Sequence, residues 1–430
     1  MRKLLGLALA AAVLFGATSA KAEILKNFKA DGQLYLLGVY DKNTQNAVND
    51  INSQTLPKLY LGMGFDLLDD VHAKVTFSKD NIYWGSYSAG GKGESIFYGL
   101  LYSVYMDEAY VAIDNMFDKF SGKVGRQYYG QEGDMVMYYG KKLEEEGSSS
   151  DDAGGIDMLK LDLTGVEDLA VTAFYARAHT TATSRVTSGD NLWSVNANAK
   201  LSPVTIGAGI YYAEDLFAAN PYLSNRVYLG DIRLAYNEGG FNIGGEFAFN
   251  FGSYHPLADT AYTYKGNAYK IHAGYKPEEA GVDIHAFWAN GSGNKDSQTD
   301  YKGYVSMNED TRFGMIYGNS DFLTDYGYNN NTLQNLQAWN VGLGYTPTFA
   351  NQLTVSGDYF NFKRNESEAG YIASGNMGGE LDIKVNWKHN EALSYGVGYG
   401  VFWLGTALKD YVGSTYANPT KIESFVNLKF

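Results

Sequence analysis

The chain has 430 residues, of which 45% are apolar and 15% aromatic, with 50 glycines and only 7 prolines. It contains no cysteine, which excludes disulfides, covalently attached haem, iron–sulfur clusters and thiol chemistry within the chain. Its formal net charge of −14 argues against nucleic acid as a partner. This composition suits a β protein with many turns, either a membrane barrel with aromatic belts or a large soluble sandwich or β-helix.

The N-terminus has the pattern of a secretory signal peptide. Arg2 and Lys3 precede an apolar run over 4–17, and Ala20-Lys21-Ala22 offers small residues at the cleavage positions. The run is too short for a membrane-spanning helix, and no later stretch approaches the length that such a helix needs. We therefore predict a signal peptide over 1–22, export of the chain, and a single mature domain over 23–430.

Several segments alternate apolar and polar residues with a period of two, which predicts strands with one apolar face. In 71–79, for example, the polar face carries His72, Lys74, Thr76 and Ser78. The segments 241–251 and 379–388 repeat the pattern, with charged residues on the polar face. A soluble sandwich also alternates, but charges at regular steps along the strands fit a water-filled barrel lumen better.

The spacing of the turns predicts an all-β fold, an antiparallel up-and-down transmembrane barrel of about eighteen strands with both ends in the periplasm. Short turns are expected near residues 69, 116, 166, 203, 238, 278, 348 and 390, and long loops near 48, 90, 142, 185, 220, 257, 314, 369 and 412. The count closes only if 291–338, rich in Asn and Gly, forms one excursion despite a strand-like piece at 311–318. A count of sixteen to twenty strands therefore stays possible. The excursion would either constrict the pore or cap it.

No residue pattern in the sequence indicates an enzyme active site, a metal site or a cofactor site. The six histidines form no H-x-x-x-H pair, and no G-x-S-x-G elbow is present. If a turn spans 277–280, Lys276 pairs with Gly281, and His272 lies directly opposite His285 inside the lumen. Such a pair would be either a pH-sensitive or weak metal-binding spot or two hydrated imidazoles. The absence of a third ligand favours the second interpretation.

The segment 107–134 resembles the alginate-export family of outer-membrane porins. Its Ala109-Tyr110-Val111 strand turns into Val124-Gly125-Arg126-Gln127, followed by a glycine-rich loop with an acidic residue, and the hairpin 156–177 continues the likeness. The resemblance covers about a sixth of the chain and implies a large monomeric barrel of about eighteen strands.

Arg126 poses a physical problem in that segment. With a turn at 115–118, Asp114 pairs with Lys119 and Asp107 faces Arg126, although the same faces carry apolar residues that should meet lipid. An arginine at the bilayer midplane of a barrel costs about 2–4 kcal/mol. Either the pair stands above the hydrocarbon, or a bulge near Gly125 turns Arg126 into the pore. We favour the bulge, which agrees with the family resemblance.

The position of each polar residue in its strand predicts the pore lining. The predicted lining residues are Lys74, Glu108, Arg126, Arg177, Asp231, Arg233, Glu246, Lys270, His272, Asp283, His285, Asp358, Glu380, Asp382 and Lys384. Acidic groups slightly outnumber basic ones among the inward charges, which disfavours a polyanion such as alginate as the solute. The acidic run 144–152 lies in a predicted loop and either binds hard cations or is simply solvated.

The last ten residues, 421–430, predict the closing strand of the barrel. Ile422, Val426, Leu428 and Phe430 should face lipid, Phe425 should face the lumen, and the strand should pair with the one near 28–40. A terminal Phe resembles the signal that the barrel-assembly machinery reads. The expected partners are therefore this machinery, outer-membrane lipid and lipopolysaccharide, and small hydrophilic solutes.

The sequence thus predicts an outer-membrane porin for passive diffusion of small hydrophilic solutes, with no cofactor and no covalent chemistry. Two other functions stay open. One is a substrate-specific exporter of a polysaccharide of the alginate type. The other is a structural barrel, either an adhesin or a sheath for cytochromes.

Overall fold

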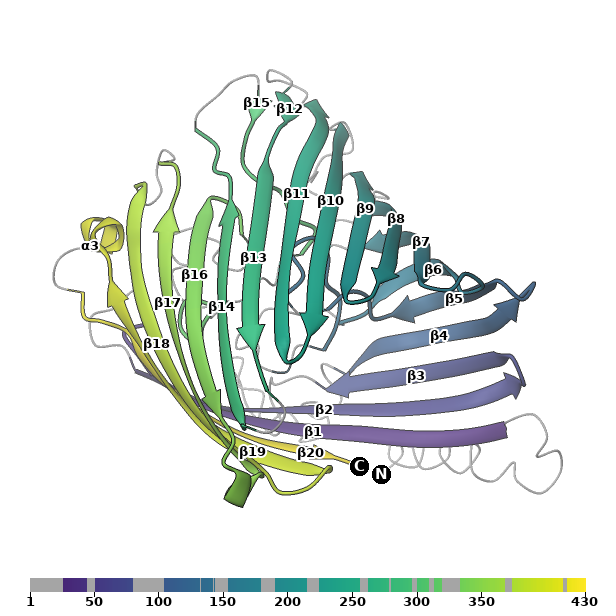
Figure 1. Cartoon of the computed structure of the whole chain (residues 1–430), viewed down its shortest axis with the longest axis horizontal. Helices are drawn as coiled ribbons and strands as arrows, with labels where there is room; N and C mark the ends of the chain where they lie inside the picture. Colours follow the sequence, from purple (N-terminus) through teal and green to yellow (C-terminus); the bar gives the residue numbers. More distant parts are fainter. Residues whose placement is uncertain are drawn as a thin grey trace, which may run out of the picture.

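The protein is a closed antiparallel β-barrel of eighteen strands (Figure 1). The computed structural model describes residues 26–44, 51–79, 104–131, 133–141, 143, 154–178, 190–214, 224–255, 262–277, 280–295, 300–308, 313–318, 333–367, 373–412 and 416–430. The predicted signal peptide 1–22 and the acidic run 144–152 lie outside these residues.

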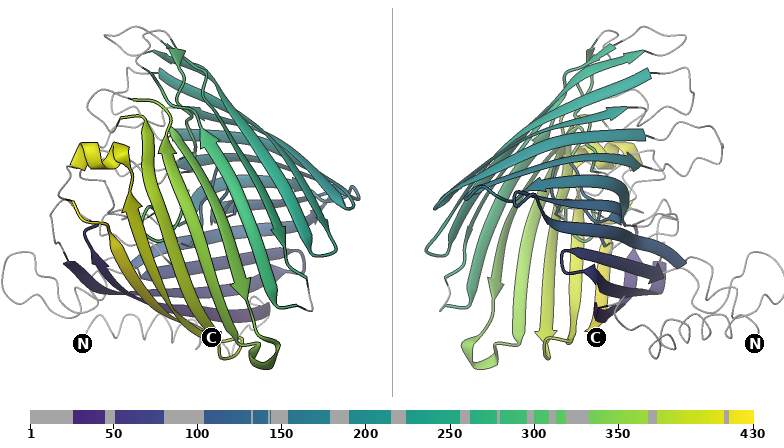
Figure 2. Two further views of the ribbon diagram at one scale, coloured as in Figure 1. Left: turned by 60° about the vertical axis from the view of Figure 1, so that its left-hand side comes forward. Right: turned by 90° about the vertical axis from the view of Figure 1, so that its right-hand side faces the viewer.

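The strands follow one another around the wall in chain order (Figure 2). They are β1 (Lys26–Lys42), β2 (Ile51–Leu68), β3 (Val71–Lys79), β4 (Val104–Met116), β5 (Phe120–Gln127), β6 (Ile156–Leu163), β7 (Leu169–Ala178), β8 (Asp190–Leu201), β9 (Val204–Glu214), β10 (Ser224–Glu238), β11 (Phe241–His255), β13 (Asn267–Tyr275), β14 (Val282–Gly291), β16 (Leu336–Tyr345), β17 (Leu353–Arg364), β18 (Gly375–Lys388), β19 (Leu393–Leu404) and β20 (Thr420–Lys429). The short turns between them lie where the sequence predicts.

The described residues form four further elements besides these eighteen strands. They are the short strands β12 (Tyr262–Tyr264) and β15 (Asp300–Tyr301), the helix α3 (Thr406–Val412) and the 3₁₀ turn η3 (Thr348–Ala350). The short strands pair in parallel with each other at the end of the barrel opposite the C-terminus (Figure 1). No helix among the described residues is long and apolar enough to cross a membrane.

The first and last strands close the barrel, as the sequence predicts. The register of β1 on β20 runs from Gln33 opposite Lys429 to Lys42 opposite Thr420. Beyond it, the backbones of Gly32 and Phe430 exchange two hydrogen bonds of 2.7 and 3.0 Å. This seam leaves no open strand edge between the two ends of the chain.

The connection between β14 and β16, which is the core of the predicted excursion 291–338, contributes no described strand to the wall. β14 pairs directly with β16, from Val282 opposite Tyr345 to Asn290 opposite Gln337. The described part of the strand-like piece, 313–318, is a turn. This pairing settles the strand count at eighteen within the predicted range of sixteen to twenty.

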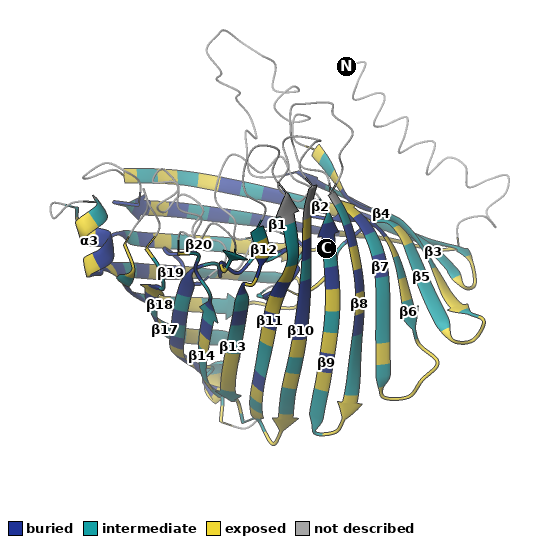
Figure 3. Ribbon diagram, turned by 90° about the horizontal axis from the view of Figure 1, so that it is seen from above, coloured by how far each residue is buried: buried dark blue, intermediate teal, exposed yellow. Residues whose placement is uncertain are grey.

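The outer face of the wall carries an apolar belt. Large apolar side chains such as Leu159, Val195, Ile232 and Leu234 are more than half exposed, while the side chains between them turn inward. Figure 3 shows this alternation as exposed and buried bands along β9, β10 and β11. An apolar surface of this extent is unfavourable in water and fits the hydrocarbon of a bilayer.

The two ends of the barrel differ. β1 begins and β20 ends where the connections are short, since Lys26 pairs with Asp66 beside the turn at 69–70. The longer connections gather at the other end. Outer-membrane barrels place short turns in the periplasm and long loops outside the cell, and we expect the same orientation for this chain.

Candidate functional site

Two segments that are not strands pack against the inner wall. They are 128–141, which follows β5 and is described apart from residue 132, and the described parts 303–308 and 313–318 of the long excursion. Met135, Tyr304 and Ile316 have no exposed side-chain surface and lie in the largest apolar cluster of the molecule. The wall contributes small side chains to this cluster, including those of Ala248, Ala268, Ala289 and Ala338. These alanines leave room for the segments, so the described part of the excursion folds inward, one of its two predicted alternatives.

The two segments bind each other. The carbonyl of Met135 accepts hydrogen bonds from the Tyr304 hydroxyl at 3.1 Å and from the Ser306 hydroxyl at 2.7 Å. The backbone N–H of Met307 donates to the carbonyl of Val136 at 3.0 Å. The segments therefore form one assembly that occupies part of the lumen.

Glu380 and Asp382 on β18 attach this assembly to the wall. The carboxylate of Glu380 accepts the backbone N–H groups of Ile316 at 2.6 Å and Tyr317 at 2.9 Å. Asp382 accepts the N–H of Met315 at 3.0 Å. Both carboxylates face inward, as the sequence predicts, but they bind the inner segment rather than standing free in the pore.

A β-bulge in β4 turns two neighbouring carboxylates inward. The pairing of β3 with β4 jumps from Thr76 opposite Glu108 to Phe77 opposite Met106, so Asp107 is the extra residue. The Thr76 hydroxyl donates to Glu108 at 2.8 Å. A bulge is what places two successive side chains on one face of a strand.

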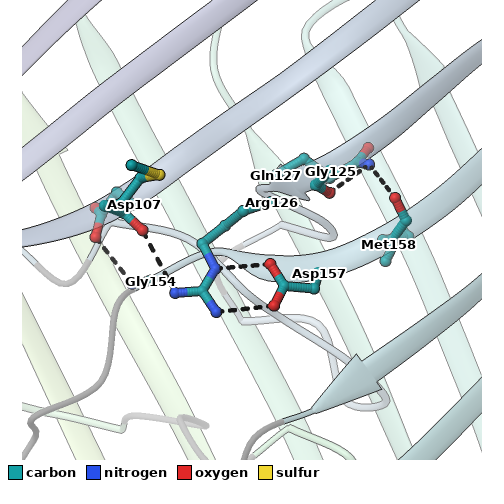
Figure 4. A network of polar contacts seen from close by, with 8 residues as sticks. Asp107, Gly125, Arg126, Gln127, Gly154, Asp157 and Met158 are labelled. Atoms are coloured by element: carbon teal, nitrogen blue, oxygen red, sulfur yellow. Dashed lines mark hydrogen bonds and ion pairs between the residues drawn. The ribbon is translucent and has the colours of Figure 1, made fainter.

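Asp107 joins the two ends of the connection that contains 128–141. Its buried carboxylate accepts hydrogen bonds from the hydroxyls of Ser78 and Tyr128, both at 2.8 Å. It also accepts the backbone N–H of Gly154 at 3.2 Å (Figure 4). Tyr128 begins the inner segment and Gly154 precedes β6, so a single side chain holds both ends of this connection.

Charged side chains of both signs gather where the first segment meets the wall. Arg233, Glu246 and Lys270 lie opposite one another on β10, β11 and β13, and Arg233 Nε approaches the carboxylate of Asp231 to 2.9 Å. The structure thus brings together four of the predicted lining residues. We refer to these four residues and Asp134 as the charged ring.

Asp134 comes from the tip of the inner segment, which the sequence identifies only as a loop. The Lys270 ammonium donates to the carbonyl of Gly133 at 3.2 Å, beside Asp134. Burial raises the pKa of Asp134 above its usual range, against smaller lowering effects of the Gln131 N–H and of the charges of Arg233 and Lys270.

The histidine pairing predicted from the sequence is wrong by two residues. His272 lies opposite Phe287, and His285 lies opposite Gly274, because the connection between the strands is longer than predicted. His285 instead contacts the carboxylate of Asp358 at 2.8 Å and that of Asp283 at 3.3 Å. A shift of two keeps the inward or outward direction of every side chain, so both imidazoles still face the lumen.

Arg126 does not point into the pore. The turn after β4 lies later than predicted, at 117–119, and the register shifts between Ile113 and Met116, so Arg126 lies opposite Ala109 rather than Asp107. The register on both sides of Gly125 is unbroken, and the bulge lies at Asp107 instead. Arg126 shares the outward face with Val124 and binds the carboxylate of Asp157 through two hydrogen bonds of 2.9 and 3.1 Å (Figure 4).

Arg177 is the second residue whose predicted direction the structure corrects. It pairs with Asp157 and lies two residues after Tyr175, which packs on Trp193 on the outer face. Side chains two residues apart in a strand share a face, so Arg177 lies with the outward aromatic residues rather than in the lumen.

The remaining predicted lining residues lie on the inner face. Lys74 binds Glu108 at 2.7 Å, and Asp283 binds Lys276 at 3.2 Å. Lys384 shares the face of Asp382 on β18 and lies opposite Ser356.

No family model matches the chain, and no curated protein matches it. These comparisons therefore give no support to the resemblance with the alginate-export family. Many solved structures do match, among them three proteins of Pseudomonas aeruginosa. OccK8 (OprE) is 11% identical with a TM-score of 0.56, covering 95% of this chain and 99% of its own. The outer membrane protein OprD is 11% identical with a TM-score of 0.56, covering 96% of each chain.

The third match is OpdK, solved with vanillate, at 10% identity and a TM-score of 0.57, covering 94% of this chain and 98% of its own. The chain shares its barrel fold with these proteins. At such low identity the likeness concerns the fold, so the chemistry of the lumen has to be argued from this chain's own residues.

Proposed function

We propose that the protein is an outer-membrane channel for the passive diffusion of small hydrophilic solutes. The observation that carries the proposal is the charged ring, where the inner segment meets a wall whose outer face is apolar. Burying a charged side chain away from water costs free energy. Charged side chains inside a membrane barrel are therefore expected where water and solutes reach them. The fold shared with an outer membrane protein supports the location.

The charged ring suggests the class of solute. Arg233 and Lys270 present two cations beside Asp134 and Glu246, so a small solute with a carboxylate can bind the cations while its polar groups meet the acids. OpdK was solved with vanillate, which is a carboxylate of this size. We therefore propose small carboxylates and similar polar nutrients as the solutes, with no covalent step.

The other functions fit less well. A polysaccharide exporter of the alginate type would need the two inner segments to leave the lumen, yet Glu380, Asp382 and Asp107 fix them to the wall. A sheath for another protein would need an empty bore, which the same segments occupy.

Recordings of the purified protein in planar bilayers test the proposal. We expect single-channel steps in KCl without any added partner, and reversible interruptions of the current when vanillate is added. A protein that inserts in its folded form but shows no steps would be a structural barrel. Steps that appear only with a second protein present would identify a coupled transporter.

A further inference from the structure

A row of polar and charged side chains crosses the outer face of β5 to β10 at the long-loop end. Each member lies opposite the next one in the sheet register, so the row is continuous over six strands. The row consists of Arg126, Asp157, Arg177, Asn191, Glu214 and Arg226. We call it the outer polar row.

An apolar row lies one step further toward the middle of the barrel on the same strands. Leu159, Tyr175, Trp193, Tyr212 and Tyr228 are each two residues away from a member of the outer polar row and lie opposite one another in the same way. Several of these side chains line a shallow depression of about 370 Å³ on the outer face. Aromatic residues mark the boundary between hydrocarbon and headgroups, so the outer polar row stands at headgroup level.

The charges of the outer polar row leave an excess of cations. Arg126 is bound by Asp157 through two hydrogen bonds, and Arg226 lies 3.5 Å from Glu214. Arg177 is exposed and has no acidic partner within ion-pair distance among the described residues. Three guanidinium groups thus face two carboxylates, and the central one is available to an anion from outside the chain.

We propose that this face binds one molecule of the phosphorylated glycolipid that fills the outer leaflet, a lipid A-type anchor of lipopolysaccharide. Arg177 and Arg226 bind its phosphates, because a guanidinium matches a phosphate with two parallel hydrogen bonds. An acyl chain lies in the depression below them, against Tyr175, Trp193 and Tyr212. The depression lies toward the middle of the membrane and the cations lie toward the headgroups. A lipid A-type molecule has its acyl chains and its phosphates at these same two levels.

The position of the row at the long-loop end favours this lipid over a phospholipid. Long loops face the outside of the cell, where the outer leaflet of this membrane consists of lipopolysaccharide. The proposal does not depend on whether the lumen conducts, because every residue that carries it lies on the outer face.

Native mass spectrometry of the purified barrel with added lipid tests the proposal. The probes are hexa-acylated diphosphoryl lipid A, the same glycolipid without phosphate, and phosphatidylglycerol. We expect the wild-type barrel to retain one diphosphoryl lipid A and to retain the other two more weakly. The double variant R177Q/R226Q should retain about tenfold less of it, as expected for lost hydrogen bonds to a charged group.

The double variant K119Q/K276Q is the matched control, because it removes two exposed cations at the short-turn end. It should retain the lipid as the wild type does. Unchanged retention in R177Q/R226Q would overturn the proposal, and so would equal retention of phosphatidylglycerol. Heat-modifiable gel mobility reports whether each variant is folded. If the double variant does not fold, R177Q alone serves as the test, and it should show a smaller loss of lipid A retention.

Discussion

The carboxylate of Glu380 on the barrel wall accepts the backbone N–H of Tyr317 at 2.9 Å, and the same carboxylate accepts the N–H of the preceding residue. The two residues are 63 positions apart in the chain. One side chain of the wall therefore binds two consecutive backbone N–H groups of the inner segment 313–318. Lys421 on β20 adds a hydrogen bond of 2.7 Å to the carbonyl of Met315.

Replacing Glu380 with alanine should release the inner segment. The change removes two hydrogen bonds to a charged acceptor, each worth about 1.5–3 kcal/mol, and leaves two buried N–H groups without a partner. We expect a larger and noisier single-channel conductance in planar bilayers. The control is E238A, which removes a carboxylate at the exposed end of β10. If E380A conducts exactly as E238A does, the segment does not limit the pore.

The wall could be predicted from the sequence because strands obey a local rule. Alternation predicts which face of a strand is apolar, and turn spacing predicts where strands end. A count of about eighteen strands, and closure of the barrel by pairing of 421–430 with the strand near 28–40, follow from these two rules. Register errors of two residues, as at His285, left the direction of side chains intact.

The interior could not be predicted because it depends on contacts between residues far apart in the chain. Glu380 and Asp382 look like pore-lining charges in their strand, and only the fold shows that backbone N–H groups of another segment bind them. The bulge at Asp107 has no local signature either. The inward direction predicted for Arg126 rests on the cost of an outward arginine at the bilayer midplane. That cost falls to about 0–1 kcal/mol near the interfaces, where Arg126 and Arg177 lie.

Replacing Asp107 with alanine should loosen both ends of the connection between β5 and β6. Ser78, Tyr128 and Gly154 would lose a buried charged acceptor that binds all three. We expect faster amide hydrogen exchange at 128–141 and at Gly154, together with a less steady conductance. D69A, at an exposed turn, provides the comparison. Exchange rates that match those of D69A would show that the segment is held by its apolar contacts alone.

Asp134 should give the channel a pH-dependent ion selectivity. Because burial raises its pKa, this carboxyl gains its proton at a higher pH than an ordinary aspartic acid, whose pKa is about 3.9. As the pH falls, the charged ring loses a negative charge beside Arg233 and Lys270, so the preference for anions should increase. Reversal potentials in a KCl gradient, measured between about pH 7 and pH 4, record this shift.

The variant D134N isolates the contribution of Asp134 to that shift. Its side chain is neutral at every pH, so D134N should prefer anions already at neutral pH and change less on acidification. Asp231 and Glu246 titrate in both proteins, and only the difference between the two curves belongs to Asp134. Parallel curves would exclude it as the source.

Replacing Gly32 with valine should weaken the seam of the barrel. A Cβ at Gly32 would overlap the ring of Phe430, which lies over this glycine while the two backbones are hydrogen-bonded. Forcing extra atoms into such a contact costs about 1–3 kcal/mol. The temperature at which the folded gel mobility is lost should therefore fall for G32V refolded in detergent. The control is G64V, because a Cβ at Gly64 meets only an ordinary contact with Ala73 at 3.8 Å. Adding F430A to G32V should restore part of the lost thermal stability. A double variant that is less stable than the sum of the two single changes predicts would contradict the overlap as the cause.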